Sequence, residues 1–196
     1  MEATQNFMKK EPLLSAFFAI LTGVGGALTI PLPIIPITMQ TFVVLMSGFL
    51  LGPKYGPLSQ ALYVALGLLG LPIFAGGAGG LHHVMSPSFG FLLGFIAASW
   101  IAGLLSRKFL SDNDKVSAFR ASAIAFAASG LMYAVAIPCF YLNMNYITRA
   151  NTGGMTFLVA LQVAFVPFII TDSIKAIAAG WLAARALPLL RKSGLL

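Results

Sequence analysis

Long apolar runs with few charged residues dominate this sequence and restrict its fold more than any other feature. Only 9% of its 196 residues are charged. A soluble domain carries about 25% charged residues, so this chain has too few to cover a water-facing surface. A helix that crosses a bilayer needs roughly 20 mostly apolar residues. We therefore expect an all-α integral membrane protein with six transmembrane helices, at about 13–30, 37–51, 57–71, 89–105, 119–142 and 157–187, the last with room for a break at Pro167.

The basic residues are divided unevenly among the segments between these runs. Of the 12 Lys and Arg residues, Arg149 lies in an alternate loop and Lys175 lies within the last run. The others fall before the first run, between the second and third, between the fourth and fifth, and toward the C-terminus. The positive side of a membrane protein is the cytoplasmic side. This pattern predicts six spans in the cell membrane with both termini in the cytoplasm.

The same rule assigns the connecting segments of one transmembrane domain, 1–196. Segments 1–12 and 106–118 are expected to be cytoplasmic, whereas the loop at 72–88 has no Lys or Arg and is expected to face outward. That loop reads PIFAGGAGGLHHVMSPS, and its mixture of glycines and apolar residues is typical of a lid that folds back over a cavity. The net charge of +7 does not indicate nucleic-acid binding, because the basic residues form no stripe.

A single acidic residue, Asp172, lies inside an apolar run. Lys175 follows three residues later, so both side chains share one face of a helix. A charge at membrane depth costs about 3 kcal/mol or more and usually faces the bundle interior, where it serves a function. A ligand or ion site is favoured, and a buried ion pair that only fixes helix packing is the alternative. Asp172 suits ligand N–H groups, and Lys175 suits a ligand oxygen.

Other polar residues near the outward side are weaker candidates. Thr38 and Gln40 follow the proline-rich segment IPLPIIP, where a helix cap and a ligand contact are equally good interpretations. His82 and His83 have no nearby carboxylate or cysteine to complete a metal set, so a hydrogen bond to a ligand is favoured over a metal. The sequence shows no Ser–His–Asp spacing, no helix-borne H-x-x-x-H and no phosphate-binding loop, so no catalytic residue, ATPase or cofactor is expected.

Small residues recur at every fourth position of the first run, at Ser15, Ala19 and Gly23. Such a stripe allows a second helix to approach closely. The spacing alone favours packing within the chain over a docking face for a partner subunit in the membrane.

Three segments resemble the BioY family, the biotin-binding subunits of energy-coupling-factor (ECF) importers. They are PLPIIPITMQTFVVLMSGFLLGPKYG, LYVALGLLGLPIFAGGAGGLHHVMSPSFGFLLGF and VPFIITDSIKA, which together cover about a third of the chain. The resemblance implies six helices with cytoplasmic termini and a biotin site near the outer side, covered by loops. It also implies partners, namely a membrane coupling subunit and two cytoplasmic ATPase subunits. Biotin would be the transported substrate.

The resemblance also assigns roles to individual residues. It makes Ser15, Ala19 and Gly23 the docking face for the coupling subunit, and it places Asp172 and Lys175 in the ligand site. The expected biotin contacts are Thr38, Gln40, Phe74, Gly77, His82, Phe89, Phe91, Tyr141, Asp172 and Lys175.

Two positions depart from the family pattern where specificity would be set. Thr171 precedes the aspartate in place of a Pro-Gly pair, and Phe91 stands where the family usually has tyrosine. The alternatives to an ECF subunit are a solitary biotin transporter that works without ATPase subunits and an intramembrane enzyme. Neither alternative has a supporting motif.

Overall fold

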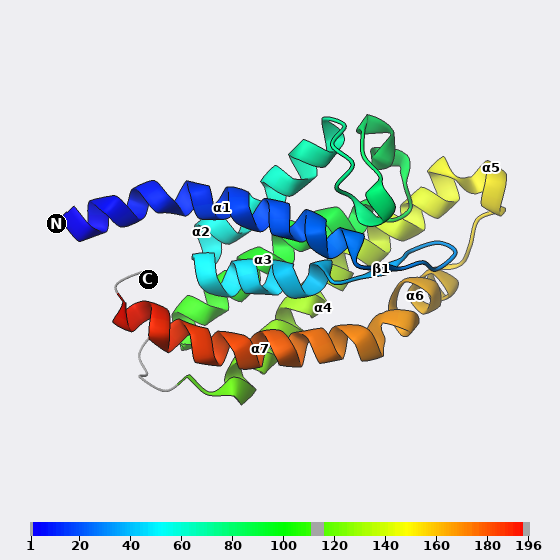
Figure 1. Ribbon diagram of the computed structural model, residues 1–196. Coiled ribbons are helices and arrows are strands. Elements are labelled where there is room, and N and C mark those ends of the chain that lie inside the picture. The colour runs from blue at the N-terminus through cyan, green and yellow to red at the C-terminus, as the bar shows by residue number, and fades with distance from the viewer. Residues whose placement is uncertain (1, 111–115, 194–196) are drawn as a thin grey trace.

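The protein is a bundle of long helices in the computed structural model, which describes residues 2–110 and 116–193 (Figure 1). The expected all-α membrane architecture is confirmed. Three described helices, at 89–109, 118–147 and 157–192, are long and apolar enough to cross a membrane. The long elements are α1 (Glu2–Ala27), α2 (Gln40–Leu68), α3 (Phe89–Phe109), α4 (Ala118–Leu142), α6 (Phe157–Phe165) and α7 (Ile169–Lys192).

Short elements join the long helices. Strands β1 (Thr29–Ile30) and β2 (Ile37–Thr38) pair antiparallel, with Thr29 opposite Thr38. The loop at 72–88 contains two 3₁₀ turns, and a π-helical turn and a short helix follow α4. A third 3₁₀ turn, which includes Pro167, separates α6 from α7, so the last apolar run is interrupted where the sequence indicated a break. These elements are η1 (Ala75–Gly77), η2 (Leu81–Met85), η3 (Asn143–Ile147), α5 (Arg149–Thr152) and η4 (Val166–Phe168).

The second and third predicted runs correspond to the two helical arms of α2, which meet at Gly52, where the chain bends back on itself. Gly52 has φ +75° and ψ −172°, a conformation that glycine adopts far more readily than other residues. The arms then touch, since a Cβ on Gly56 would lie 3.0 Å from the Cα of Gly48. The Gln60 amide joins them by donating to Ser47 Oγ over 3.1 Å. Two short apolar runs therefore form a helical hairpin.

Close packing through alanine and glycine holds the bundle together. Helix α3 packs against α2 and α4, α1 packs on α2, and α7 packs on α4 and α2. Side chains at these crossings are small, and Ala102, Ala125 and Ala179 are fully buried. Lipid tails are as apolar as the helix surfaces, so close van der Waals contact between small residues drives association in a membrane.

The two ends of the bundle differ in character. Helix α1 begins and α7 ends at the same end (Figure 1). Basic residues gather there, since Arg107 lies against Gly52 and Arg191 donates to the Leu110 carbonyl over 2.7 Å. Segment 1–12, which was expected to be cytoplasmic, forms the first part of α1, because this helix begins at Glu2. Of the expected loop 106–118, residues 111–115 lie outside the described residues. The opposite end carries the β-hairpin and the loop at 72–88.

Replacement of Gly52 by alanine should destabilise the protein by about 1–3 kcal/mol, because a Cβ is strained at positive φ and would also collide with Arg107. Thermal unfolding in detergent measures the loss. Gly130→Ala is the matched control, because a Cβ at this helical glycine meets nothing within 4 Å and should cause no loss. Equal stability of Gly52→Ala and the parent protein would contradict the account of the kink.

Candidate ligand-binding site

A buried ion pair lies at the start of α7. Lys175 Nζ is 2.7 Å from Asp172 Oδ1, and the two residues are only 7% and 6% exposed. The expectation that these side chains share a face and pair is confirmed. Their helix begins directly after η4, which places the pair one turn inside the bundle at the end that carries the loops. Two charges buried this deeply require partners for their remaining hydrogen-bonding capacity.

Tyr133 on α4 supplies one such partner. Its hydroxyl donates to Asp172 Oδ2 over 2.5 Å, so each carboxylate oxygen has one protein partner. The tyrosine ring is held edge-on between Phe91 and Phe165, with centroid distances of 6.0 and 4.9 Å. Tyr133 could not be singled out from the sequence, because a tyrosine within an apolar run looks like a packing residue until its partner Asp172 is known.

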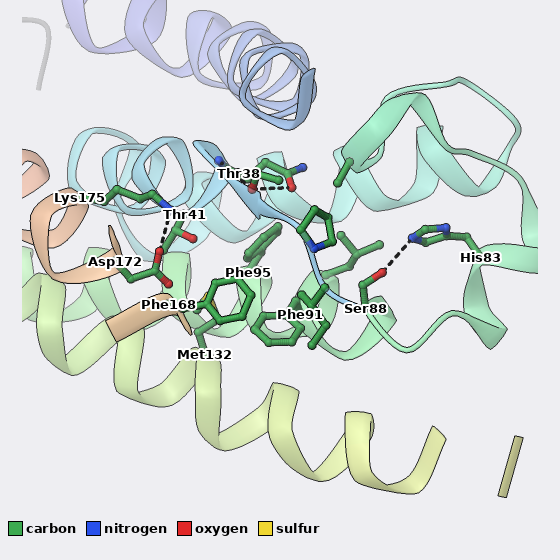
Figure 2. Close-up of a pocket in the computed structure, with 15 residues that line it drawn as sticks. Thr38, Thr41, His83, Ser88, Phe91, Phe95, Met132, Phe168, Asp172 and Lys175 are labelled. Atoms are coloured by element: carbon green, nitrogen blue, oxygen red, sulfur yellow. Dashed lines mark hydrogen bonds and ion pairs between the residues drawn. The ribbon is translucent and has the colours of Figure 1, made fainter. Parts of the chain in front are cut away.

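A narrow cavity opens beside the ion pair (Figure 2). Its volume is about 40 Å³, enough for roughly three water molecules at about 10–15 Å³ each. Polar groups line one part of it, and aromatic rings of Phe91, Phe95 and Phe168 line another. The full lining is Ile35, Pro36, Thr38, Gln40, Thr41, Ala75, His83, Ser88, Phe91, Leu92, Phe95, Met132, Phe168, Asp172 and Lys175.

Five of the ten expected contact residues line this cavity, namely Thr38, Gln40, Phe91, Asp172 and Lys175. The cavity also has lining residues that were not predicted from the sequence, among them Thr41, Phe95, Met132 and Phe168. These four lie on helical faces whose direction the sequence alone does not show.

The other five expected contacts do not line the cavity. Phe74 is fully buried but packs against Tyr63 and His83, with ring centroids 5.5 and 4.6 Å apart. The Tyr141 ring lies against Phe157 at 5.7 Å, on the far part of α4.

Local backbone geometry keeps the remaining three expected contacts, Gly77, His82 and Phe89, away from the cavity wall. Phe89 is the first residue of α3, whereas Phe91 two positions later reaches the cavity. Gly77 has φ +76° and serves the tight turn of η1. His82 is exposed, while its neighbour His83 lines the cavity, because adjacent residues point in different directions.

A series of hydrogen bonds connects strand β2 to the loop at 72–88. Thr38 donates to the Gln40 side-chain oxygen over 3.1 Å, and the Gln40 amide donates to the Tyr63 hydroxyl. The Tyr63 hydroxyl in turn lies 3.3 Å from the Ile73 carbonyl. Gln40 thus connects β2 to the loop at 72–88, and that loop contributes Ala75, His83 and Ser88 to the cavity wall.

The small-residue stripe of α1 packs within the chain, as its spacing alone favoured, so these three residues do not form the surface docking face that the resemblance implied. The Ser15 hydroxyl donates to the Tyr55 carbonyl over 3.0 Å, and Ala19 is fully buried. A Cβ on Gly23 would lie 3.2 Å from the Ile73 Cβ. Helix α2 and the loop that follows it therefore occupy the space that these small residues leave beside α1.

The candidate site thus combines an acceptor carboxylate, a donor ammonium group and aromatic walls inside the helix bundle of a membrane protein. The BioY family profile matches residues 2–192, and the chain belongs to the BioY family. The probable biotin transporter BioY of Lysinibacillus sphaericus is 36% identical over 191 residues, 95% of this chain and 93% of the relative. The biotin transporter BioY of Thermotoga maritima is 36% identical over 176 residues, 90% of this chain and 95% of the relative.

A solved structure shares the fold. It is the crystal structure of the S-component for biotin from an ECF-type ABC transporter, with a TM-score of 0.69 and 27% identity, covering 95% of this chain and 93% of that chain. The family and these relatives are transporters, so the intramembrane-enzyme alternative is not supported.

Removal of the Tyr133 hydroxyl should lower the free energy of unfolding by about 1.5–3 kcal/mol, because a hydrogen bond to a buried carboxylate is lost. Tyr133→Phe keeps the ring contacts, and thermal unfolding in detergent measures the loss. Tyr141→Phe is the control, since within the described residues its hydroxyl makes no hydrogen bond. A similar loss in both variants would mean that the Tyr133 hydroxyl does not stabilise Asp172.

Acid should loosen the contact of η2 with the rest of the loop. Burial, with a smaller contribution from the charge of His82, lowers the pKa of His83. As the pH falls below about 6.5, protonation of His83 therefore disfavours the conformation in which its ring is packed against Phe74. Hydrogen exchange at 81–85, corrected for intrinsic rates, should show less protection at about pH 5 than at about pH 8. His83→Phe should remove this dependence, and His82→Phe should retain it. Persistence of the dependence in His83→Phe would exclude His83 as its source.

Proposed function

We propose that this protein binds biotin with high affinity and imports it as the substrate-binding subunit of an ECF-type transporter. The observation that carries the proposal is the Asp172–Lys175 pair, buried beside an aromatic-lined cavity in a chain of the BioY family. The relatives are named for biotin transport, which supports this choice of substrate. The solitary-transporter alternative gains no support from the S-component neighbour.

The chemistry of biotin fits the groups that the site offers. Its ureido ring has two N–H donors, which suit the Asp172 carboxylate. A carboxylate oxygen has more than one lone pair, so Asp172 can accept these donors while it keeps Lys175 and Tyr133. The Lys175 ammonium suits an oxygen of the ligand, and the rings of Phe91 and Phe168 suit the apolar thioether ring.

The cavity must widen to hold the whole ligand. Cavities that enclose drug-sized ligands measure roughly 300–1,000 Å³, whereas this one measures about 40 Å³. The cavity wall includes loop residues such as Pro36 and His83, which loop movement can displace without disturbing the helices. Binding therefore requires a shift of the loops or of the side chains around Lys175.

We infer six spans, formed by α1, the two arms of α2, α3, α4 and the α6–α7 pair. The end at which α1 begins and α7 ends would face the cytoplasm, and the basic residues there, including Lys54 and Arg107, support this orientation. The loops over the cavity would then face outward and receive biotin. Segment 72–88 would serve as the lid.

Transport would be driven by partners, because the chain has no nucleotide-binding motif. We propose a membrane coupling subunit and two cytoplasmic ATPase subunits, as the similarity to an S-component supports. A partner that docks on α1 must use its outward face, where Leu13, Phe17, Ile20 and Val24 are exposed. The buried Ser15, Ala19 and Gly23 would then act indirectly, by fixing how close α1 lies to α2.

Replacement of Asp172 by alanine should weaken biotin binding by about 2 kcal/mol or more, roughly thirtyfold, because the acceptor is lost and Lys175 is left unpaired. Equilibrium binding to the purified protein, with folding verified by thermal unfolding, measures the effect. Ser173→Ala, the adjacent position on the same helix, should bind as the parent does. Equal affinity of folded Asp172→Ala and the parent protein would rule out the proposed site.

A further inference from the structure

Thr41, in the first turn of α2, is a polar residue of the cavity wall whose hydroxyl the packing of the protein does not use. The residue is only 6% exposed, and within the described residues its hydroxyl makes no hydrogen bond. A buried polar group without a partner lowers stability, so most such groups in proteins are hydrogen-bonded. An exception at the wall of a ligand cavity points to a partner that enters the cavity.

The position of Thr41 explains why its hydroxyl is unpaired. A threonine inside a helix can donate to the carbonyl four residues earlier, as Thr22 does to Phe18 over 2.8 Å. The residue four positions before Thr41 is Ile37, which belongs to strand β2 and not to the helix. The hydroxyl of Thr41 therefore has no intrahelical acceptor at this distance along the chain.

Other polar side chains of the cavity wall already have partners. Thr38 donates to the Gln40 side-chain oxygen over 3.1 Å, and the Ser88 hydroxyl lies 3.5 Å from His83 Nε2. Thr41 differs from these hydroxyl groups because its own remains available to a ligand.

The neighbouring ion pair indicates which ligand atom this hydroxyl meets. Figure 2 shows Thr41 beside Asp172 and Lys175, and all three line the same cavity. The pair places an acceptor and a donor only 2.7 Å apart, so a ligand group that meets both must carry a donor and an acceptor side by side. The N–H and C=O of a ureido ring do so. Lys175 has three N–H donors and a carbonyl oxygen has two lone pairs, which leaves room for a second donor on that oxygen.

We propose that Thr41 is a specificity-determining residue, whose hydroxyl donates to the ureido oxygen of the ligand held at Asp172 and Lys175. The inference rests on the proposed biotin site. Asp172 then accepts an N–H of the ureido ring, and Lys175 and Thr41 share its oxygen. The ligand supplies the partner that the Thr41 hydroxyl lacks in the free protein. A ligand of the same shape with a weaker acceptor at this atom gains less from Thr41.

Two variants of Thr41 separate the hydroxyl from the shape of the side chain. Thr41→Val keeps the shape and removes the hydroxyl, whereas Thr41→Ser keeps the hydroxyl and removes the methyl group. Equilibrium binding of biotin to the full chain in detergent should weaken about tenfold in Thr41→Val and stay within about threefold of the parent in Thr41→Ser. The reverse order, or equal affinity of the parent and Thr41→Val, would overturn this inference alone. Absence of biotin binding to the folded parent protein would overturn the proposed function itself.

The ligand atom is identified with 2-thiobiotin, in which sulfur, a weaker acceptor, replaces the ureido oxygen. The parent protein should prefer biotin over 2-thiobiotin by about fivefold more than Thr41→Val does, because the variant has lost a donor that distinguishes the two atoms. Competition against labelled biotin measures both preferences. The same preference in the two proteins would contradict donation to this oxygen.

The stability of the free proteins is a second readout. Replacement of an unpaired hydroxyl by a methyl group should leave the unfolding temperature unchanged or raise it, so Thr41→Val should unfold no earlier than the parent without ligand. Thr22→Val makes the same change at a hydroxyl that donates to the Phe18 carbonyl, and it should unfold earlier. An equal loss of stability in both variants would show that the Thr41 hydroxyl serves the fold, which would contradict the proposal.

Discussion

Burying Asp172 and Lys175 inside a bundle of apolar helices is the constraint on which the rest of the structure depends. Removing two charges from water costs several kcal/mol for each ion, and their mutual attraction offsets this only with good geometry and further hydrogen bonds. The 2.7 Å pair and the Tyr133 hydroxyl meet that demand. An apolar pair of similar volume would serve packing equally well, which supports the proposal that this pair is a ligand-binding site.

The geometry of the site follows from how the backbone is bent and packed around this pair. The bend at Gly52 returns α2 upon itself and brings Tyr63 beside Gln40, so one hairpin joins the β2 strand to the loop at 72–88. Small alanine and glycine residues between α7 and α4 let the two helices lie close together. This short distance allows Tyr133 on α4 to reach Asp172 on α7. The small residues of α1 have the same purpose within the chain, and the outward face of α1 is left for lipid or a partner.

Much of this arrangement could be predicted from the sequence, and the misses have physical causes. Apolar length and basic asymmetry predicted an all-helical membrane chain, and the i, i+3 spacing predicted the ion pair. The two arms of α2 were predicted as separate apolar runs, but their direct junction at Gly52 was not, because a glycine between two apolar runs does not reveal whether a loop or a kink joins them. His82 was named in place of His83, and Phe74 was expected at the cavity, because side-chain directions in an irregular loop follow from turns that composition does not determine.

Equilibrium binding of biotin to the purified protein, with desthiobiotin and lipoate as competitors, tests the central claim most directly. Desthiobiotin keeps the ureido ring that Asp172 is proposed to bind, whereas lipoate keeps a sulfur ring and a carboxylate tail without it. The account predicts tight biotin binding that desthiobiotin displaces and lipoate does not. Folded protein that fails to bind biotin, or that releases it equally to lipoate, would contradict recognition of the ureido ring by the buried carboxylate.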